Sequence, residues 1–328
     1  MTICVIAQPI HPIGIEILLA AGIEVVQVVG TSLEALEKVI PSADALIVRD
    51  RLPAYCMDLA PKLTVIANHG TGTDKVDVDY ATSLGIPVVF TPTANVRSVA
   101  EHALMLMLAT GRHAVLADTA ARQGNWAFKY EQPMQSLYGK TLGVVGLGHT
   151  GRLVCEMASV GLGMKVIVWS PSLPTDTYLP VGVERTSCLK DLLQISDVVS
   201  LHRPLRQDTF HMLNRETLQQ MKRGAIVINT SRGALIDEVA LVEALRSGHL
   251  FGAGLDVFEQ EPLLPDSLLS GIQNVILTPH IAGSSQDALK ATASQCAQQI
   301  VAVLSGDRPE NLVRPHVWEN RRRLACVN

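Results

Sequence analysis

An excess of basic residues is absent, and this argues against two classes of partner. The 27 lysines and arginines are balanced by 31 aspartates and glutamates, so the net charge is −4, and neither half of the chain is basic. A protein that mainly binds nucleic acid or an anionic membrane surface usually presents a basic face. We therefore expect neither of these partners.

Long apolar runs and the marks of secretion are lacking as well. The apolar run at 103–111 is far shorter than the roughly 20 residues that cross a bilayer. The first residues, MTICVIAQPI, have no basic start of the kind that signal peptides carry, and they are typical of a first β-strand. The expectation is a cytoplasmic protein without a membrane segment.

The few cysteines show neither metal-site nor disulfide spacing. The chain has six, at positions 4, 56, 155, 188, 296 and 326. We interpret them as small buried hydrophobic residues in a reducing compartment, and we expect no metal site.

Apolar residues, in contrast, are abundant. They form 48% of the 328 residues, and charged residues form only 18%, which is the composition of a packed globular protein. A chain of this length can form two domains, each with a substantial core.

Short runs of β-branched residues alternate with helical stretches, and this order is typical of parallel βαβ units. Four strands are predicted in the first third of the chain, at Ile3–Ala7, Ala45–Val48, Val65–Asn68 and Val88–Phe90. A second series is predicted at Leu142–Val145, Lys165–Trp169, Val198–Leu201, Ala225–Asn229, Ala253–Leu255 and Val275–Leu277. The two series predict an α/β protein with two doubly wound parallel sheets.

Two long helices are expected to connect these domains. Ser98-Val-Ala-Glu101 has the pattern of a capping box and is expected to open an apolar helix. A second helix is expected from Gln286 to Ser305, returning the chain to the first domain. We thus expect one domain from residues 1–97 plus 286–328 and another from residues 98–285.

A glycine motif stands between a predicted strand and a predicted helix. In TLGVVGLGHTGRL, Gly146 permits a tight turn, Gly148 lets the backbone approach a pyrophosphate, and Gly151 lets helix and strand pack closely. His149 and Thr150 lie on the first turn of the helix, where free amides favour an anion. The motif predicts a dinucleotide site.

The next strand, KVIVW, ends without the acidic residue that usually binds the ribose of NAD. That position is Ser170, whose hydroxyl can bind a ribose but does not repel a 2′-phosphate. Arg203 follows a neighbouring predicted strand and is a candidate cation for NADP; an exposed loop arginine is the other interpretation. We expect NAD, with NADP also open.

Three later motifs each place a polar or charged residue directly after an apolar strand, where doubly wound sheets bind ligands. They are INTSRGALIDE (228–238), GLDVFEQEPL (254–263) and LTPHIAGS (277–284). Together with GLGHTG, they resemble the motifs of the D-isomer-specific 2-hydroxyacid dehydrogenases, a family that includes phosphoglycerate, hydroxypyruvate and glyoxylate enzymes. The resemblance implies a Rossmann-type NAD(P)-binding domain inserted in a split, flavodoxin-like substrate domain.

Three residues in these motifs suit the reduction of a 2-keto acid. Arg232 can bind the carboxylate through its planar guanidinium, His280 can donate a proton to the carbonyl oxygen, and Glu261 can favour the protonated imidazole. The resemblance implies that these are the family's catalytic Arg, His and Glu. The alternatives without a catalytic role are a surface arginine for Arg232, a core histidine for His280 and a solvated acid for Glu261.

The resemblance also implies further contacts. Asp256 matches an aspartate beside the nicotinamide, although a turn cap is its alternative role. The other implied cofactor contacts are His202, Pro204, Thr209, Thr230, Ser231, Ala282 and Gly283. The implied substrate loop contains His69, Gly70 and Thr71, with backbone amides for a carboxylate, and Arg49 stands at the place of a cleft arginine or a structural salt bridge.

The sequence therefore predicts an NAD(P)-dependent dehydrogenase of a small 2-keto or D-2-hydroxy acid, and by resemblance a homodimer joined through the helix after Ser98. An NAD(H)-sensing module like the C-terminal binding protein corepressors, without turnover, is the alternative from another class. Oxidation of formate or phosphite is a third, although its extra cleft residues have no clear match here.

Overall fold

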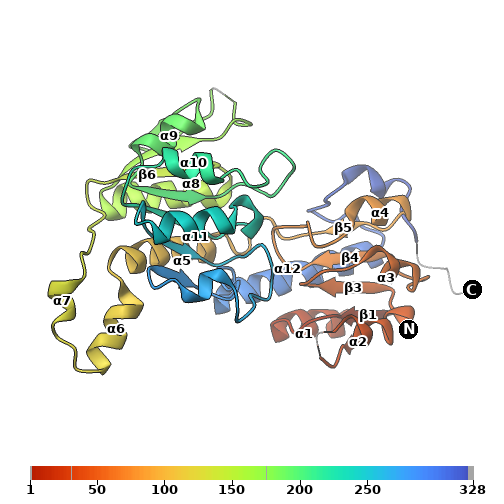
Figure 1. Ribbon diagram of the computed structural model, residues 1–328. Helices are drawn as coiled ribbons and strands as arrows, with labels where there is room; N and C mark the ends of the chain where they lie inside the picture. The colour runs from red at the N-terminus through yellow and green to blue at the C-terminus, as the bar shows by residue number, and fades with distance from the viewer. Residues whose placement is uncertain (1, 31, 175, 324–328) are drawn as a thin grey trace, which may run out of the picture. The chain divides into compact units, whose positions relative to one another are not determined.

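The computed structural model describes every residue except 1, 31, 175 and 324–328. It divides into two compact units, one formed by Met1–Asn95 with Gly283–Asn328 and the other by Val96–Ala282. Each unit has its own parallel sheet with helices on both faces (Figure 1). In the part of the chain that the structure describes, no helix combines the length and apolar character needed to cross a membrane.

The first unit contains a five-stranded parallel sheet in the order β2-β1-β3-β4-β5. Its strands are β1 (Ile3–Ile6), β2 (Glu24–Gln27), β3 (Ala45–Val48), β4 (Val65–Asn68) and β5 (Val88–Val89). Its helices are α1 (Pro12–Ala20), α2 (Leu33–Glu37), α3 (Ala54–Asp58), α4 (Val78–Ser83) and α12 (Gln286–Leu304), with short helical turns at η1 (Ile40–Ser42) and η5 (Pro315–Trp318). The strand order 2-1-3-4-5 is that of flavodoxin-like domains, as predicted.

Helix α12 belongs to the first unit although almost two hundred residues separate it from β5 in the sequence. Its Cys296, Ala297 and Ile300 are fully buried in one cluster with Cys4 and Ile6 of β1. The helix packs closely on α1, because a Cβ atom at Gly14 would lie 3.0 Å from the carbonyl oxygen of Ala293. Burial of this apolar face stabilises the return of the chain to the first sheet.

The second unit contains a seven-stranded parallel sheet in the order β12-β11-β10-β9-β6-β7-β8. Its strands are β6 (Thr141–Val145), β7 (Lys165–Trp169), β8 (Val183–Arg185), β9 (Val198–Leu201), β10 (Ala225–Asn229), β11 (Leu250–Leu255) and β12 (Val275–Leu277). Counted within the unit, the first six strands have the Rossmann order 3-2-1-4-5-6, and β12 extends that sheet. The order reverses between β6 and β9, where such sheets bind their ligands.

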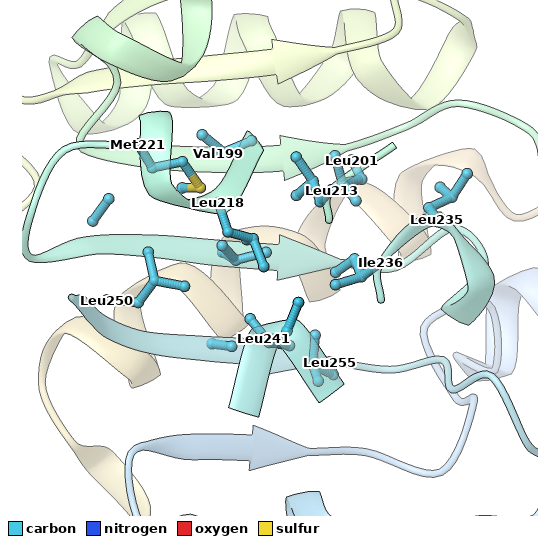
Figure 2. Close-up of a cluster of buried hydrophobic side chains, with 14 of the residues drawn as sticks. Val199, Leu201, Leu213, Leu218, Met221, Leu235, Ile236, Leu241, Leu250 and Leu255 are labelled. Carbon is cyan, nitrogen blue, oxygen red and sulfur yellow. The ribbon is translucent and has the colours of Figure 1, made fainter. Parts of the chain in front are cut away.

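Helices cover both faces of this second sheet. The helices of this unit are α5 (Val96–Gly111), α6 (Ala114–Arg122), α7 (Phe128–Glu131), α8 (His149–Glu156), α9 (Leu189–Ile195), α10 (Arg215–Gln220) and α11 (Glu238–Arg246), with short turns at η2 (Met157–Gly161), η3 (Gly233–Leu235) and η4 (Leu268–Gly271). Of these, α6 and α7 lie away from the sheet (Figure 1). Figure 2 shows one core layer, in which Leu241 of α11 and Leu218 of α10 lie against side chains of β9 and β11. A second layer packs α5 and α8 on the opposite face.

Two strands and one helix start differ from the sequence predictions. The edge strands β2 and β8 were not predicted, because they are short and only partly buried. The capping box at Ser98 is wrong: α5 already begins at Val96, and the Ser98 hydroxyl donates to the carbonyl of Ala282 at 2.6 Å. The helix expected from Gln286 is confirmed, and Ser285 caps it through its side chain.

Candidate active site

The turn between β6 and α8 has room only for glycine at two of its three motif positions. Gly146 has φ +104°, and a Cβ atom there would lie 2.8 Å from the carbonyl oxygen of His202. A Cβ atom at Gly151 would overlap the carbonyl oxygen of Gly146. At Gly148 a Cβ atom would meet nothing within 4 Å, so this glycine faces open space. The turn therefore keeps a space beside its backbone at Gly148.

The first turn of α8 borders this space. Gly148 is the N-cap of α8, and no side chain caps the amides that follow it, at His149 and Thr150. Uncapped amides and the positive end of the helix dipole favour a phosphate. The residues of this turn thus fit the pyrophosphate of a dinucleotide.

Arg203 lies at the end of the neighbouring strand β9 and is largely buried. Its Nη2 donates to Asp208 Oδ2 at 3.0 Å, and its guanidinium carbon lies 5.3 Å from the ring centroid of Trp169. Trp169 is the last residue of β7, and Ser170 follows it directly. The structure therefore brings Arg203 and Ser170 to the same end of the sheet.

Three other predicted contacts around β9 hold the loop together. His202 Nε2 lies 2.8 Å from the hydroxyl of Ser200, and burial lowers the pKa of His202 to about 4, so this imidazole is neutral. Thr209 is fully buried, accepts from the amide of Arg206 at 2.7 Å and donates to the carbonyl of Pro204 at 2.8 Å. The Thr209 hydroxyl shapes the loop, and Pro204 itself is exposed.

The segment after β10 carries Thr230, Ser231 and Arg232. Thr230 Oγ1 is buried without a hydrogen-bond partner among the described residues, and the Ser231 hydroxyl donates to the carbonyl of Arg203 at 2.5 Å. Asn229 holds the segment in place, because its Nδ2 donates to the carbonyl of Arg232 and its Oδ1 accepts from the amide of Ser231. An unpartnered buried hydroxyl at this strand end suits a bound cofactor.

Arg232 is half-buried, and its Nη1 donates to the carbonyl of Ser231 at 2.7 Å. The residue after it must be small, since a Cβ atom at Gly233 would overlap the backbone of Phe258. The Arg232 segment therefore lies directly against the segment that leads to Glu261.

His280 and Glu261 form a hydrogen-bonded pair. His280 Nδ1 lies 2.8 Å from Glu261 Oε2, with the histidine side chain 40% exposed and the glutamate side chain 25% exposed. Glu261 Oε1 also accepts from the amide of Phe258 at 3.3 Å. His280 has φ +52°, an uncommon conformation for a residue other than glycine. The predicted acid–base pair is thus assembled within the second unit.

Asp256 fixes the backbone on both sides of the His280 side chain. Its buried carboxylate accepts from the amides of Ile281 and Ala282 at 2.9 and 2.8 Å, and from the hydroxyl of Thr278 at 2.6 Å. Its carbonyl oxygen accepts from the amide of His280 at 2.9 Å. These bonds are those of the turn cap that the sequence left open as an alternative.

The substrate loop predicted in the first unit follows β4. The amides of His69 and Gly70 donate to the carbonyls of Val48 and Asn68 at 2.8 and 2.9 Å, so both amides already have acceptors. Thr71 Oγ1 donates to Asn95 Oδ1 at 2.8 Å. The expected carboxylate binding by the two amides would have to displace these bonds.

Two side chains in and beside this loop are better placed for a ligand. His69 Nε2 is buried and lacks a hydrogen-bond partner in the described part of the chain. Burial, together with the charge of Arg49, lowers the pKa of His69 to about 4, so the imidazole is neutral near pH 7. Arg49 is exposed and is anchored by Nη1 to the carbonyl of Pro9 at 2.8 Å.

Comparison with known proteins matches residues 104–282 to the family model "D-isomer specific 2-hydroxyacid dehydrogenase, NAD binding domain". The chain belongs to the D-isomer specific 2-hydroxyacid dehydrogenase family. Over 287 residues it is 40% identical to a glyoxylate reductase of Korarchaeum cryptofilum, covering 86% of each chain.

Two further relatives of this dehydrogenase are a longer enzyme and a solved structure. A D-3-phosphoglycerate dehydrogenase of Methanocaldococcus jannaschii is 41% identical over 310 residues, which cover 94% of this chain but only 58% of that enzyme. An NADPH-dependent glyoxylate/hydroxypyruvate reductase of Sinorhizobium meliloti, solved in complex with NADP and malonate, superposes with a TM-score of 0.86 at 29% identity over 99% of both chains. Family membership makes this dehydrogenase an NAD(P)-dependent oxidoreductase of small 2-hydroxy and 2-keto acids.

Sequence reasoning missed two networks that support the dehydrogenase site. His102 of α5 has its Nε2 3.0 Å from the Thr278 hydroxyl and 3.5 Å from Asp256, and burial lowers its pKa against the pull of Asp256. Glu238 and Glu259 accept each other's backbone amides at 2.9 and 2.7 Å. For Glu238 and Glu259, the available signal was their position as charged residues within the motifs INTSRGALIDE and GLDVFEQEPL. Nothing in the sequence pointed to His102.

Proposed function

We propose that His280, Glu261 and Arg232 carry out the acid–base and substrate-binding steps of a 2-hydroxyacid dehydrogenase. The 2.8 Å bond between His280 Nδ1 and Glu261 Oε2 is the observation that carries this proposal. Because Nδ1 is held by a carboxylate, Nε2 is the nitrogen that exchanges a proton with the substrate. In reduction, the imidazolium donates from Nε2 to the carbonyl oxygen; in oxidation, the imidazole accepts the proton of the 2-hydroxyl group.

Glu261 and Arg232 act on the charges of the reaction. Glu261 holds the ring orientation and stabilises the imidazolium through its negative charge. Arg232 has a planar guanidinium, suited to the two oxygens of the substrate carboxylate, and its bond to the Ser231 carbonyl limits its rotation.

We assign cofactor binding to the second unit. When bound, the nicotinamide supplies the hydride to C2 of the keto acid or accepts it from the hydroxy acid. Gly148 and the α8 amides would hold the pyrophosphate, Ser170 and Arg203 the adenosine side, and Thr230 the cofactor beyond β10. In this proposal, Asp256 positions the His280 backbone and the nearby loop residues Ala282 and Gly283 complete the nicotinamide side.

We assign part of substrate recognition to the loop that carries His69 in the first unit. A neutral imidazole with an unpartnered Nε2, and a cation on Arg49 close enough to lower its pKa, suit a small acid rich in oxygen atoms. The names of the relatives make glyoxylate and hydroxypyruvate the first substrates to test.

Replacement of His280 by Gln tests the assignment. The variant should lose a factor of about 10² to 10⁴ in kcat, because the proton transfer no longer has a donor, whereas the Kd of the reduced cofactor should stay within about two-fold. Steady-state rates with glyoxylate and hydroxypyruvate, and cofactor fluorescence titrations, measure the two quantities. Glu261→Gln is the matched variant, with a smaller loss because the ring nitrogen keeps a neutral acceptor.

Two outcomes would contradict the proposal. Wild-type turnover in His280→Gln would remove the histidine from the mechanism. A wild-type chain that binds the cofactor tightly but reduces no 2-keto acid in a broad panel would favour the NAD(H)-sensing module.

We further propose a cytoplasmic homodimer. The apolar side chains of Met105 and Leu108 on α5 are exposed and line, with Leu104 and Met157, a shallow apolar hollow that suits a contact between two copies. Free thiols suit a reducing compartment. Of the cysteines in the described part of the chain, Cys4, Cys56, Cys155 and Cys296 are buried, whereas Cys188 is exposed, so the interpretation as a buried residue is wrong for Cys188. A monomeric mass by light scattering would contradict the homodimer. Finding the protein in an oxidising compartment would contradict the cytoplasmic location.

A further inference from the structure

Arg203 starts on one strand and ends beside another. Strands β9, β6 and β7 are neighbours, and Val145 of β6 pairs with both Leu201 and Trp169, so the three strands end level. Arg203 stands two residues beyond β9, yet its guanidinium carbon lies 5.3 Å from the centre of the Trp169 ring at the end of β7. The side chain therefore crosses the end of β6.

Gly146 makes this crossing possible. A Cβ atom at Gly146 would lie 2.9 Å from Cγ of Arg203, so the aliphatic part of the arginine runs over the first glycine of the cofactor turn. The guanidinium thus reaches the end of β7, where Ser170 stands in place of an acidic residue.

Arg203 forms an ion pair with Asp208, and the two side chains differ in exposure. The arginine side chain is only 10% exposed, whereas that of its partner Asp208 is 62% exposed. The indole of Trp169 and the carboxylate of Asp208 stabilise the cation where it lies. An exposed carboxylate can be exchanged for another anion while the buried cation stays in place.

We propose that Arg203 binds the 2′-phosphate of NADP(H), and that Asp208 weakens this binding by holding the same guanidinium. The inference rests on the proposed cofactor site in the second unit. A guanidinium can bind two phosphate oxygens at once, and the hydroxyl of Ser170 leaves the neighbouring position uncharged. For NAD(H), Ser170 provides a hydrogen bond to the ribose, and Arg203 stays paired with Asp208.

Binding of cofactor fragments to the wild-type chain and its variants tests the inference without turnover. We compare 2′,5′-ADP, which carries the 2′-phosphate, with 5′-AMP, which lacks only this group, by calorimetry at fixed ionic strength. Arg203→Met keeps an apolar chain over Gly146 and against Trp169 but removes the charge. It should weaken the binding of 2′,5′-ADP by roughly ten-fold or more, the size of one charge-assisted hydrogen bond, and leave the binding of 5′-AMP within about two-fold.

Two further variants separate this effect from misfolding and from general electrostatics. Asp208→Asn should bind 2′,5′-ADP about three- to ten-fold more tightly, because the guanidinium loses a competing anion, and a gain cannot arise from a damaged fold. Arg206→Met removes an exposed cation from the same loop and should change both fragments equally.

The outcomes distinguish the inference from the proposed function. If both fragments bind and neither Arg203→Met nor Asp208→Asn changes their ratio, Arg203 does not bind the 2′-phosphate, although the cofactor site stands. If neither fragment nor the full cofactors bind to the wild-type chain, the proposed cofactor site itself is wrong. If Arg206→Met weakened 2′,5′-ADP selectively and by as much as Arg203→Met does, the effect would be one of general charge, and the inference would be wrong.

Discussion

The two halves of the seven-stranded sheet prepare their ligand-binding ends by different means. At the ends of β9, β6 and β7, the turn depends on side chains that are missing: Gly148 faces open space, and Gly151 has no room for a Cβ atom. At the ends of β10, β11 and β12, carboxylates hold the loops through backbone amides, as the buried Asp256 does around His280.

This difference shows how each half tolerates change. A glycine turn acts through the space that it leaves, so an added atom damages it directly. A carboxylate that accepts backbone amides acts through its hydrogen bonds. A change to the neutral amide of similar volume therefore breaks these bonds.

The largest effect is expected in the glycine turn. Gly151→Ala places a methyl group onto the carbonyl of Gly146 and should lower the free energy of unfolding by about 3 kcal/mol or more. Gly148→Ala is the matched change in open space, and it should leave Tm nearly unchanged while weakening ADP binding at least about ten-fold. Chemical denaturation and calorimetry measure both; equal Tm losses in the two variants would contradict the contrast within the turn.

A smaller effect is expected at Asp256, the carboxylate that holds the His280 loop. Asp256→Asn places an amide group where one oxygen now accepts from Ile281 or Ala282, so His280 should lose its position and kcat should fall roughly ten- to hundred-fold. The affinity for ADP-ribose, which lacks the nicotinamide, should not change. Asp237→Asn is the control, because an Asn caps α11 as well as an Asp does. If Asp256→Asn lowered the affinity for ADP-ribose by the same factor as kcat, the two halves of the sheet would not act separately, and the comparison would be wrong.

At neutral pH, the smallest effect is expected at His202, on the glycine half, because this effect appears only in acid. Burial lowers its pKa to about 4 in the folded chain, below the value of about 6.5 in the unfolded chain. Above pH 6.5 both states are neutral and the folded state is unaffected. As the pH falls from 6.5 to 4, the unfolded state takes up the proton first, so the folded state loses at most about 3 kcal/mol.

His202→Gln should remove this part of the pH dependence, because glutamine can still bond to Ser200 but does not titrate. Unfolding free energies measured between pH 4 and 7 check it, and an unchanged slope in the variant would show that His202 is protonated in the folded state. His69→Gln provides the same measurement in the first unit, since burial lowers the pKa of His69 to about 4 as well.

The sequence predicted the buried strands better than the edges of the sheets. Fully buried strands such as β3 and β10 have an apolar residue at almost every position. This pattern can be recognised in the sequence without knowledge of the strands that pair with them. The edge strands β2 and β8 carry Glu24, Gln27 and Glu184, because one side of an edge strand faces water. Similarly, Ser98 has the residues of a capping box around it but lies inside α5 and bonds to Ala282.

By itself, the sequence determined the class of fold through the spacing of strands and helices, and it indicated the kind of chemistry through the resemblance of its motifs to a known family. Glycines at 146, 148 and 151 between a strand and a helix specify a turn locally, and the motifs around Arg232, Glu261 and His280 each follow a buried strand. Only the tertiary structure decided the partners: Asp256 with the His280 loop, and Arg203 with Trp169 and Asp208. Those contacts join side chains that are brought together by parallel strand pairing, and the distances between them are not encoded in any local pattern.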